Sequence, residues 1–120
     1  MSEEGIILEV KETKTIEEGK HKGVIANMVY ETRKDFAYID IYIDLQDGND
    51  ITIKTGFPAN ISEKSTFGRF LMEAGLDVIP GQKIELKAVK KRLVGKTIEF
   101  TTYNDDNDFA RVVNKTIKFV

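Results

Sequence analysis

Three aromatic residues fall on one face of the most regular segment of this chain. Residues 36–45 (FAYIDIYIDL) alternate strictly, which predicts a β-strand with Phe36, Tyr38 and Tyr42 on one side and apolar residues on the other. An aromatic ring stacks on a nucleobase with a stabilisation of about 1 to 3 kcal/mol per base, and cations beside the ring neutralise phosphates. This face is therefore a candidate site for single-stranded nucleic acid.

Residue patterns typical of catalysis or metal binding are missing from the sequence. The chain has no cysteine and one histidine, His21, which excludes thiolate sites, a cysteine nucleophile and a histidine-rich metal site. It contains no GK[ST] phosphate loop, GxGxxG, GxSxG or HExxH motif. Residues 104–108 (NDDND) begin like a calcium loop, but Phe109 and Lys115 stand where that loop needs glycine and glutamate. We expect no enzyme activity, no catalytic residues, no metal and no cofactor.

The length and composition fit one compact domain. The chain has 120 residues, of which 41% are hydrophobic and 32% are charged. The net charge is −2, but residues 1–50 hold 6 Lys or Arg against 12 Asp or Glu, whereas residues 51–120 hold 12 against 8. Contacts with phosphates are therefore expected mainly in the second part. The missing cysteines, the missing apolar run of about 20 residues and the missing secretory signal favour a cytoplasmic protein with no membrane partner.

The remaining segments predict a mainly β fold. Residues 20–30 are apolar on both faces and contain Gly23, which predicts a long strand that bends. An Asp-Gly pair within residues 46–49 predicts a hairpin that joins strand 36–45 to a strand over 50–57. Helical spacing predicts one helix over 62–75. Further strands are expected at 82–89, around Ile98 and Phe100, at 109–113 and at 116–120, with a basic loop at 90–96.

The N-terminal segment differs in character from the rest. Residues 1–17 are rich in Glu and Lys and are expected to form an arm ahead of a single domain over residues 18–120. An apolar patch within this arm lets it either stay loose or pair as an extra strand. The patch consists of Ile6, Ile7, Leu8 and Val10.

The order of these elements resembles the oligonucleotide/oligosaccharide-binding (OB) fold over residues 18–104. A long bent first strand, a tight hairpin, a helix between strands three and four and a Pro-Gly turn before strand four carry the resemblance. The segments STFGRFLMEAGL, IPGQKIEL and GKTIEFTTYNDDNDFARV are also similar to small OB-like proteins of phages and mobile elements that are presumed to bind single-stranded DNA. The resemblance implies a five-stranded OB-like barrel with one helix between strands three and four, additional terminal β segments, and an accessory role in DNA replication or recombination.

In that fold, ligands bind on the face of strands two and three and on the loops after strands one and four. The resemblance thus implies a nucleic-acid site that joins the aromatic face to two basic loops. We expect bases to stack on Tyr38 and Tyr42 while cations contact phosphates, with single-stranded DNA, or alternatively RNA, as the partner. The candidate residues are Arg33, Lys34, Phe36, Tyr38, Tyr42, Thr52, Lys54, Lys90, Lys91, Arg92 and Lys96.

Other interpretations of the same residues stay open. Aromatic residues are common in strands, so the aromatic face becomes a second core layer if a terminal segment covers it. Asp40 and Asp44 lie on the same face, where they would repel phosphate. The acidic first part and the apolar patch suit an OB-like module that binds another protein or forms a homo-oligomer, and Tyr38 and Tyr42 would then belong to a protein interface.

Overall fold

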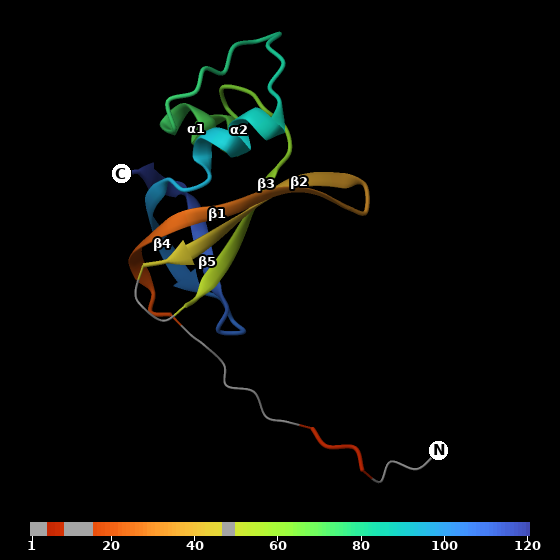
Figure 1. Cartoon of the computed structure of the whole chain (residues 1–120), viewed down its shortest axis with the longest axis vertical. Coiled ribbons are helices and arrows are strands. Elements are labelled where there is room, and N and C mark those ends of the chain that lie inside the picture. The colour runs from red at the N-terminus through yellow and green to blue at the C-terminus, as the bar shows by residue number, and fades with distance from the viewer. Residues whose placement is uncertain (1–4, 9–15, 47–49) are drawn as a thin grey trace.

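Five antiparallel strands and two helices make up this chain in a computed structural model that describes residues 5–8, 16–46 and 50–120. The strands form one sheet in the order β3-β2-β1-β4-β5, and both helices lie beyond one end of it (Figure 1). The predicted mainly β class is thus confirmed. The elements are β1 (Gly19–Arg33), β2 (Phe36–Leu45), β3 (Thr52–Pro58), α1 (Thr66–Glu73), α2 (Leu86–Leu93), β4 (Thr97–Asn104) and β5 (Ala110–Phe119).

The first strand, β1, pairs with two other strands. Its first part, Gly19–Val24, pairs with β4, and Gly23–Arg33 pairs with β2. The register with β2 shifts between Ile25 and Asn27. Gly23 is buried where the two pairings overlap, and a Cβ atom there would lie 2.9 Å from a carbonyl oxygen of β2. Because no side chain fits such a close approach, glycine is needed at this point, and the predicted long, bent strand is confirmed.

Strands β2 and β3 form the predicted hairpin. Their register runs from Tyr38 opposite Pro58 to Asp44 opposite Thr52. Most of the predicted turn, residues 47–49, lies outside the described residues. The alternation of β2 correctly predicts its buried face, since each inward aliphatic side chain after Ala37 is at most 8% exposed: Ile39, Ile41, Ile43 and Leu45.

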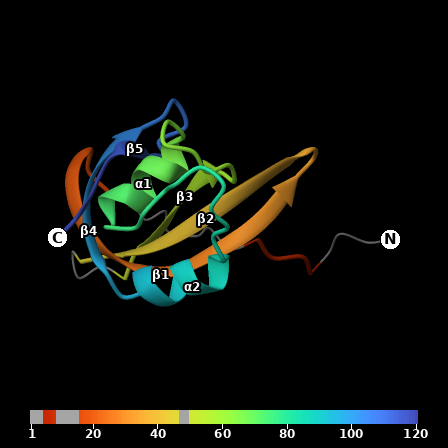
Figure 2. The same ribbon diagram turned by 90° about the horizontal axis from the view of Figure 1, so that it is seen from above.

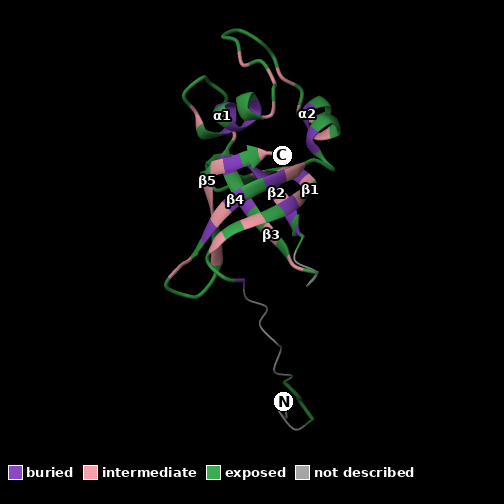
Figure 3. Cartoon of the chain, turned by 90° about the vertical axis from the view of Figure 1, so that its left-hand side faces the viewer, coloured by how far each residue is buried: buried purple, intermediate pink, exposed green. Residues whose placement is uncertain are grey.

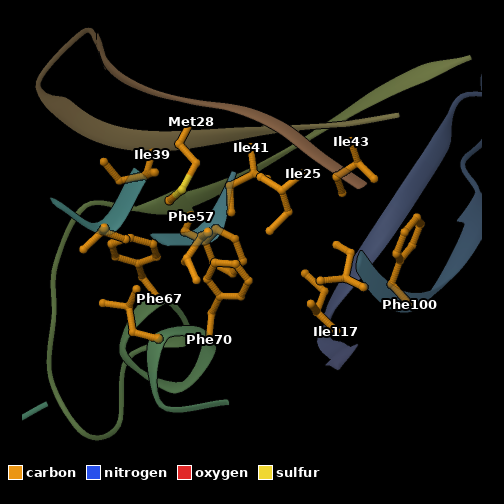
Figure 4. Close-up of a cluster of buried hydrophobic side chains, with 14 of the residues drawn as sticks. Ile25, Met28, Ile39, Ile41, Ile43, Phe57, Phe67, Phe70, Phe100 and Ile117 are labelled. Carbon is orange, nitrogen blue, oxygen red and sulfur yellow. The ribbon is translucent and has the colours of Figure 1, made fainter. Parts of the chain in front are cut away.

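Aromatic rings from β3 and α1 form the centre of the core, against the aliphatic side chains of β1 and β2 (Figure 4). The ring centroid of Phe57 lies 5.6 Å from that of Phe67 and 5.0 Å from that of Phe70. Phe57 is fully buried, and the two helix residues are 3% and 4% exposed. This packing fixes α1 against the sheet, since aromatic side chains contribute the largest buried areas of a core.

The predicted helix is confirmed, although α1 is shorter than the segment 62–75. Ser65 lies just before the helix, and its hydroxyl oxygen accepts a hydrogen bond from the backbone N–H of Gly68 at 2.9 Å. This N-cap starts the helix after the first residues of the predicted segment. Gly75, with a φ of +86°, follows the last turn as expected for a helix C-terminus.

The predicted strand 82–89 and the predicted basic loop 90–96 are wrong, because α2 occupies this part of the chain. The alternation of apolar residues suggested a strand. However, Leu86, Val89 and Leu93 also recur at helical spacing, and as a helix they share one face. Val89 and Leu93 are 5% and 3% exposed, so this face joins the core. The chain therefore has a second helix where the resemblance implied a fourth strand.

The sheet is not closed into the barrel that the resemblance implied. Edge strands β3 and β5 lie near each other (Figure 2), but no backbone ladder joins them in the described part of the chain. Asn114 bridges the seam, because its Nδ2 donates to the Gly56 carbonyl at 3.1 Å and its Oδ1 accepts from the Thr55 hydroxyl at 2.5 Å. The predicted closing segments 109–113 and 116–120 belong, except for their outermost residues Phe109 and Val120, to one strand, β5.

Candidate nucleic-acid interface

The aromatic residues lie on the face of β1, β2 and β3 that points away from the core, here called the outer face. Buried and more exposed bands alternate along the strands (Figure 3), as expected when successive side chains point to opposite sides. Phe36 is 66% exposed, and Tyr38 and Tyr42 are half-buried. Among the described elements, only β1 and β3 neighbour β2. In this part of the chain, no third element covers the outer face.

An ion pair between Arg33 and Asp40 lies at the middle of the outer face. The Asp40 side chain is 1% exposed, whereas the Arg33 side chain is 42% exposed. The Arg33 guanidinium also lies over the Tyr38 ring, 5.0 Å from its centroid, and 3.3 Å from the Glu31 carboxylate. The expected repulsion of phosphate by Asp40 is therefore offset, because an arginine of the neighbouring strand neutralises and covers this carboxylate.

Strand β3 places two candidate residues beside β2. In the strand register, Lys54 lies opposite Tyr42, and Thr52 lies opposite Asp44. The Thr52 hydroxyl donates to the Asp44 carboxylate at 2.6 Å. Lys54 is exposed and forms no ion pair with any residue that the structure describes. Lys54, directly across from the Tyr42 ring, thus has an ammonium group without a carboxylate partner among the described residues.

The tip of the hairpin between β1 and β2 carries Lys34. Its φ of +57° fits a tight turn, and its side chain is exposed. Phe36 follows at the start of β2. These two residues extend the outer face toward the end of the sheet that projects furthest from β4 and β5 (Figure 1).

The basic residues of α2 lie apart from the two tyrosines. Leu86 and Val89 of this helix line a hollow of about 160 Å³ together with Ile39, which is on the core side of β2. Tyr38 and Tyr42 point to the opposite side of that strand. The structure therefore does not bring the two tyrosines together with the cations that were predicted in a basic loop. These cations lie in the last turn of α2 and in the segment after it: Lys90, Lys91, Arg92 and Lys96.

Two polar residues of β1 complete the outer face, and the sequence interpretation missed them. Asn27 lies opposite Tyr42, and Glu31 lies opposite Tyr38. They were missed because the first strand reads as apolar on both faces. The sequence does contain a signal for this face, because Asn27, Glu31 and Arg33 follow a period of two. This period begins only after the register shift.

The acidic segment after β4 forms a turn. Asp105 accepts hydrogen bonds from the backbone N–H of Asn107 at 2.9 Å and of Phe109 at 3.0 Å, and from the Arg111 Nε at 2.8 Å. The hydrogen bond from Arg111, followed by that from Phe109, lowers the pKa of Asp105 below its usual value. The Asp105 carboxylate therefore stabilises the turn.

Neither a metal site nor a membrane span is found among the described residues. No three side chains of the metal-binding types gather there, and no helix in the described ranges has the length and apolar character needed to cross a membrane. The sequence matches no protein-family model and no curated protein. The outer face must therefore be judged from its own residues.

Proposed function

We propose that this protein is a non-catalytic module that binds single-stranded nucleic acid, preferentially DNA, on the outer face of β2 and β3. The observation that carries the proposal is the adjacency of Tyr42 and Lys54 on neighbouring strands. The three carboxylates of the same face already have partners: Asp40 and Glu31 contact Arg33, and Asp44 accepts a hydrogen bond from a threonine hydroxyl. One place thus offers a ring for stacking and a cation for a phosphate, the two elements of sequence-tolerant single-strand binding.

The fold that we propose is an OB-like barrel left open at one seam. The bent β1 shared between β2 and β4 supports this proposal, as does the bridge by which Asn114 holds β5 against β3. OB-fold ligands bind on the face of strands two and three, which is where the tyrosines lie. An accessory role in replication or recombination, in the cytoplasm, is part of the same proposal and rests on the resemblance to the phage and mobile-element proteins.

The candidate residues have different roles in this proposal. Tyr42 stacks on a base, and Lys54 contacts the adjoining phosphate. Lys34 and Phe36 extend the path of the strand toward the hairpin tip. Arg33 is a positioning residue, because its guanidinium pairs with a buried carboxylate and orients the Tyr38 ring. The cations of α2 and the segment after it contribute only to long-range attraction of the polyanion.

Fluorescence anisotropy with a labelled single DNA strand of about 30 nucleotides tests the proposal. One OB fold covers about 4 to 16 nucleotides, so this strand is long enough. We expect affinity to fall as salt rises and duplex DNA to compete poorly. An RNA strand of the same sequence, used as competitor, measures the preference for DNA. Absence of binding at micromolar protein and low salt would contradict the proposal.

Matched variants locate the site. Tyr42→Ala should weaken binding about tenfold or more, and Lys54→Gln should reduce the slope of log affinity against log salt by about 0.7. The controls are Tyr103→Ala, which removes a tyrosine of β4 that is 49% exposed, and Lys118→Gln, which removes an exposed cation of β5. Equal losses in the control variants would remove the assignment to the outer face.

A further inference from the structure

A cleft separates β3 from β5 beyond the Asn114 bridge. Its volume is about 770 Å³, and it lies between the start of β3 and the loop that leads into β5. Half-buried Ile51 and Ile53 line one side, and Phe109, which is 61% exposed, lines the other. Edge strands without a backbone partner are templates for a further strand. The cleft therefore combines open strand edges with apolar side chains, beside charged lining residues that include Asp50, Lys54 and Arg111.

The N-terminal arm contains an apolar segment that is exposed to water. Ile6, Ile7 and Leu8 are 65%, 89% and 86% exposed and lie away from the sheet (Figure 1). Three successive large aliphatic side chains in water are unfavourable, and β-branched residues favour an extended conformation. This segment has the composition of a short strand that lacks a partner.

The same arm already inserts an aliphatic side chain into the cleft where it joins the domain. Ile16 is 9% exposed, lines the cleft and belongs to the core. The next residues are fixed to β4, since the Glu17 carbonyl accepts from the Thr102 hydroxyl at 3.4 Å and the Glu18 carboxylate accepts from the Asn104 N–H at 2.8 Å. The cleft is thus suited to aliphatic side chains of this arm.

We propose that the cleft binds residues 6–8 of a second copy of the chain as an added strand along β3. Ile6 and Leu8 share one side of such a strand and pack against Ile51 and Ile53. The occupant is a second copy because Ile16 of the same chain already fills part of the cleft while residues 6–8 lie away from their own sheet. Reciprocal exchange of two arms closes a two-fold symmetric dimer, the commonest form of soluble oligomer.

Sedimentation equilibrium measures the predicted dimer. The wild-type chain should self-associate, and Ile6→Asp combined with Leu8→Asp should weaken association at least about tenfold, because it removes two buried aliphatic side chains. Ile79→Asp is the matched control, since this isoleucine is 60% exposed and lies in the loop before α2. Circular dichroism checks that each variant is folded. A wild-type chain that stays monomeric at high concentration, or equal weakening in the control, overturns the proposal.

Disulfide crosslinking identifies the segment and the copy, because the chain has no cysteine of its own. Leu8→Cys and Ile53→Cys chains, one of them isotope-labelled, should form a mixed disulfide dimer under mild oxidation. The yield should exceed that of Leu8→Cys with Val120→Cys, whose position is 70% exposed. Equal yields overturn the proposal, as does an internal disulfide without dimer when both substitutions share one chain. Neither readout involves nucleic acid, so its failure is separate from a failure of the proposed function.

Discussion

Replacement of Arg33 tests how the outer face is held together. Arg33 pairs with Asp40, whose side chain is 1% exposed, and lies 5.0 Å from the Tyr38 ring centroid. Loss of one partner from a fully buried ion pair costs about 3 to 5 kcal/mol, and the cation–π contact adds about 0.5 to 1 kcal/mol at an exposed site. Because the Arg33 side chain is 42% exposed, water can solvate the Asp40 carboxylate in part after Arg33 is removed, which reduces the loss of stability. We therefore expect Arg33→Gln to lower the free energy of unfolding by about 2 kcal/mol.

Urea denaturation of a double-mutant cycle measures this effect. In an Asp40→Asn background the carboxylate is gone, so Arg33→Gln should cost less there, with a coupling energy of about 1 kcal/mol or more. Lys34→Gln, which removes the neighbouring exposed cation, should change stability by less than about 0.5 kcal/mol. Additive effects in the cycle, or equal effects of Arg33→Gln and Lys34→Gln, would refute the structural role of the pair.

Gly23→Ala should destabilise the fold by about 1 to 3 kcal/mol in urea, because the new methyl group meets the β2 backbone; an unchanged midpoint would contradict the close crossing. Asn114→Ala should cost about 1 to 3 kcal/mol and speed hydrogen exchange at the seam between β3 and β5, since it leaves a buried hydroxyl without its acceptor. An NMR titration should give Asp105 a pKa below the unfolded value of about 3.9, and Arg111→Gln should raise it. A carboxylate with a lowered folded-state pKa stabilises the fold above its unfolded pKa and loses this contribution as pH falls through the lowered value, so the stability difference between wild type and Arg111→Gln should shrink in acid.

The sequence predicted the elements whose patterns have one solution. The alternation of residues 36–45 permits a single buried face, and the helical spacing of residues 62–75 predicted α1, although its N-terminal boundary was placed too early. The apolar residues of segment 82–89 fit a period of two, whereas those of segment 86–93 fit a helical period. Leu86, Val89 and Leu93 share one face only in a helix. Packing of this face against the core therefore decides between strand and helix, and a local sequence pattern does not contain this packing.

The candidate site was predicted in part for the same reason. The aromatic residues follow from the alternation of β2 alone. The neutralisation of Asp40 depends on a long side chain that reaches from another strand, and the bridge by Asn114 joins residues 58 positions apart. The separation of the α2 cations from Tyr42 depends on which side of the sheet a helix covers. Such relations are set by tertiary structure, so single-sequence patterns do not contain them.

NMR mapping of the backbone amides with a short oligothymidine tests the central claim most directly. Chemical-shift changes should cluster at the outer face, around Tyr42 in β2 and Lys54 in β3, and should reach the hairpin tip near Lys34. Amides of α2 should change little, because this helix lies on the opposite side of β2. Changes that centre on α2, or no changes at saturating oligonucleotide, would contradict the assignment of the outer face as the binding surface.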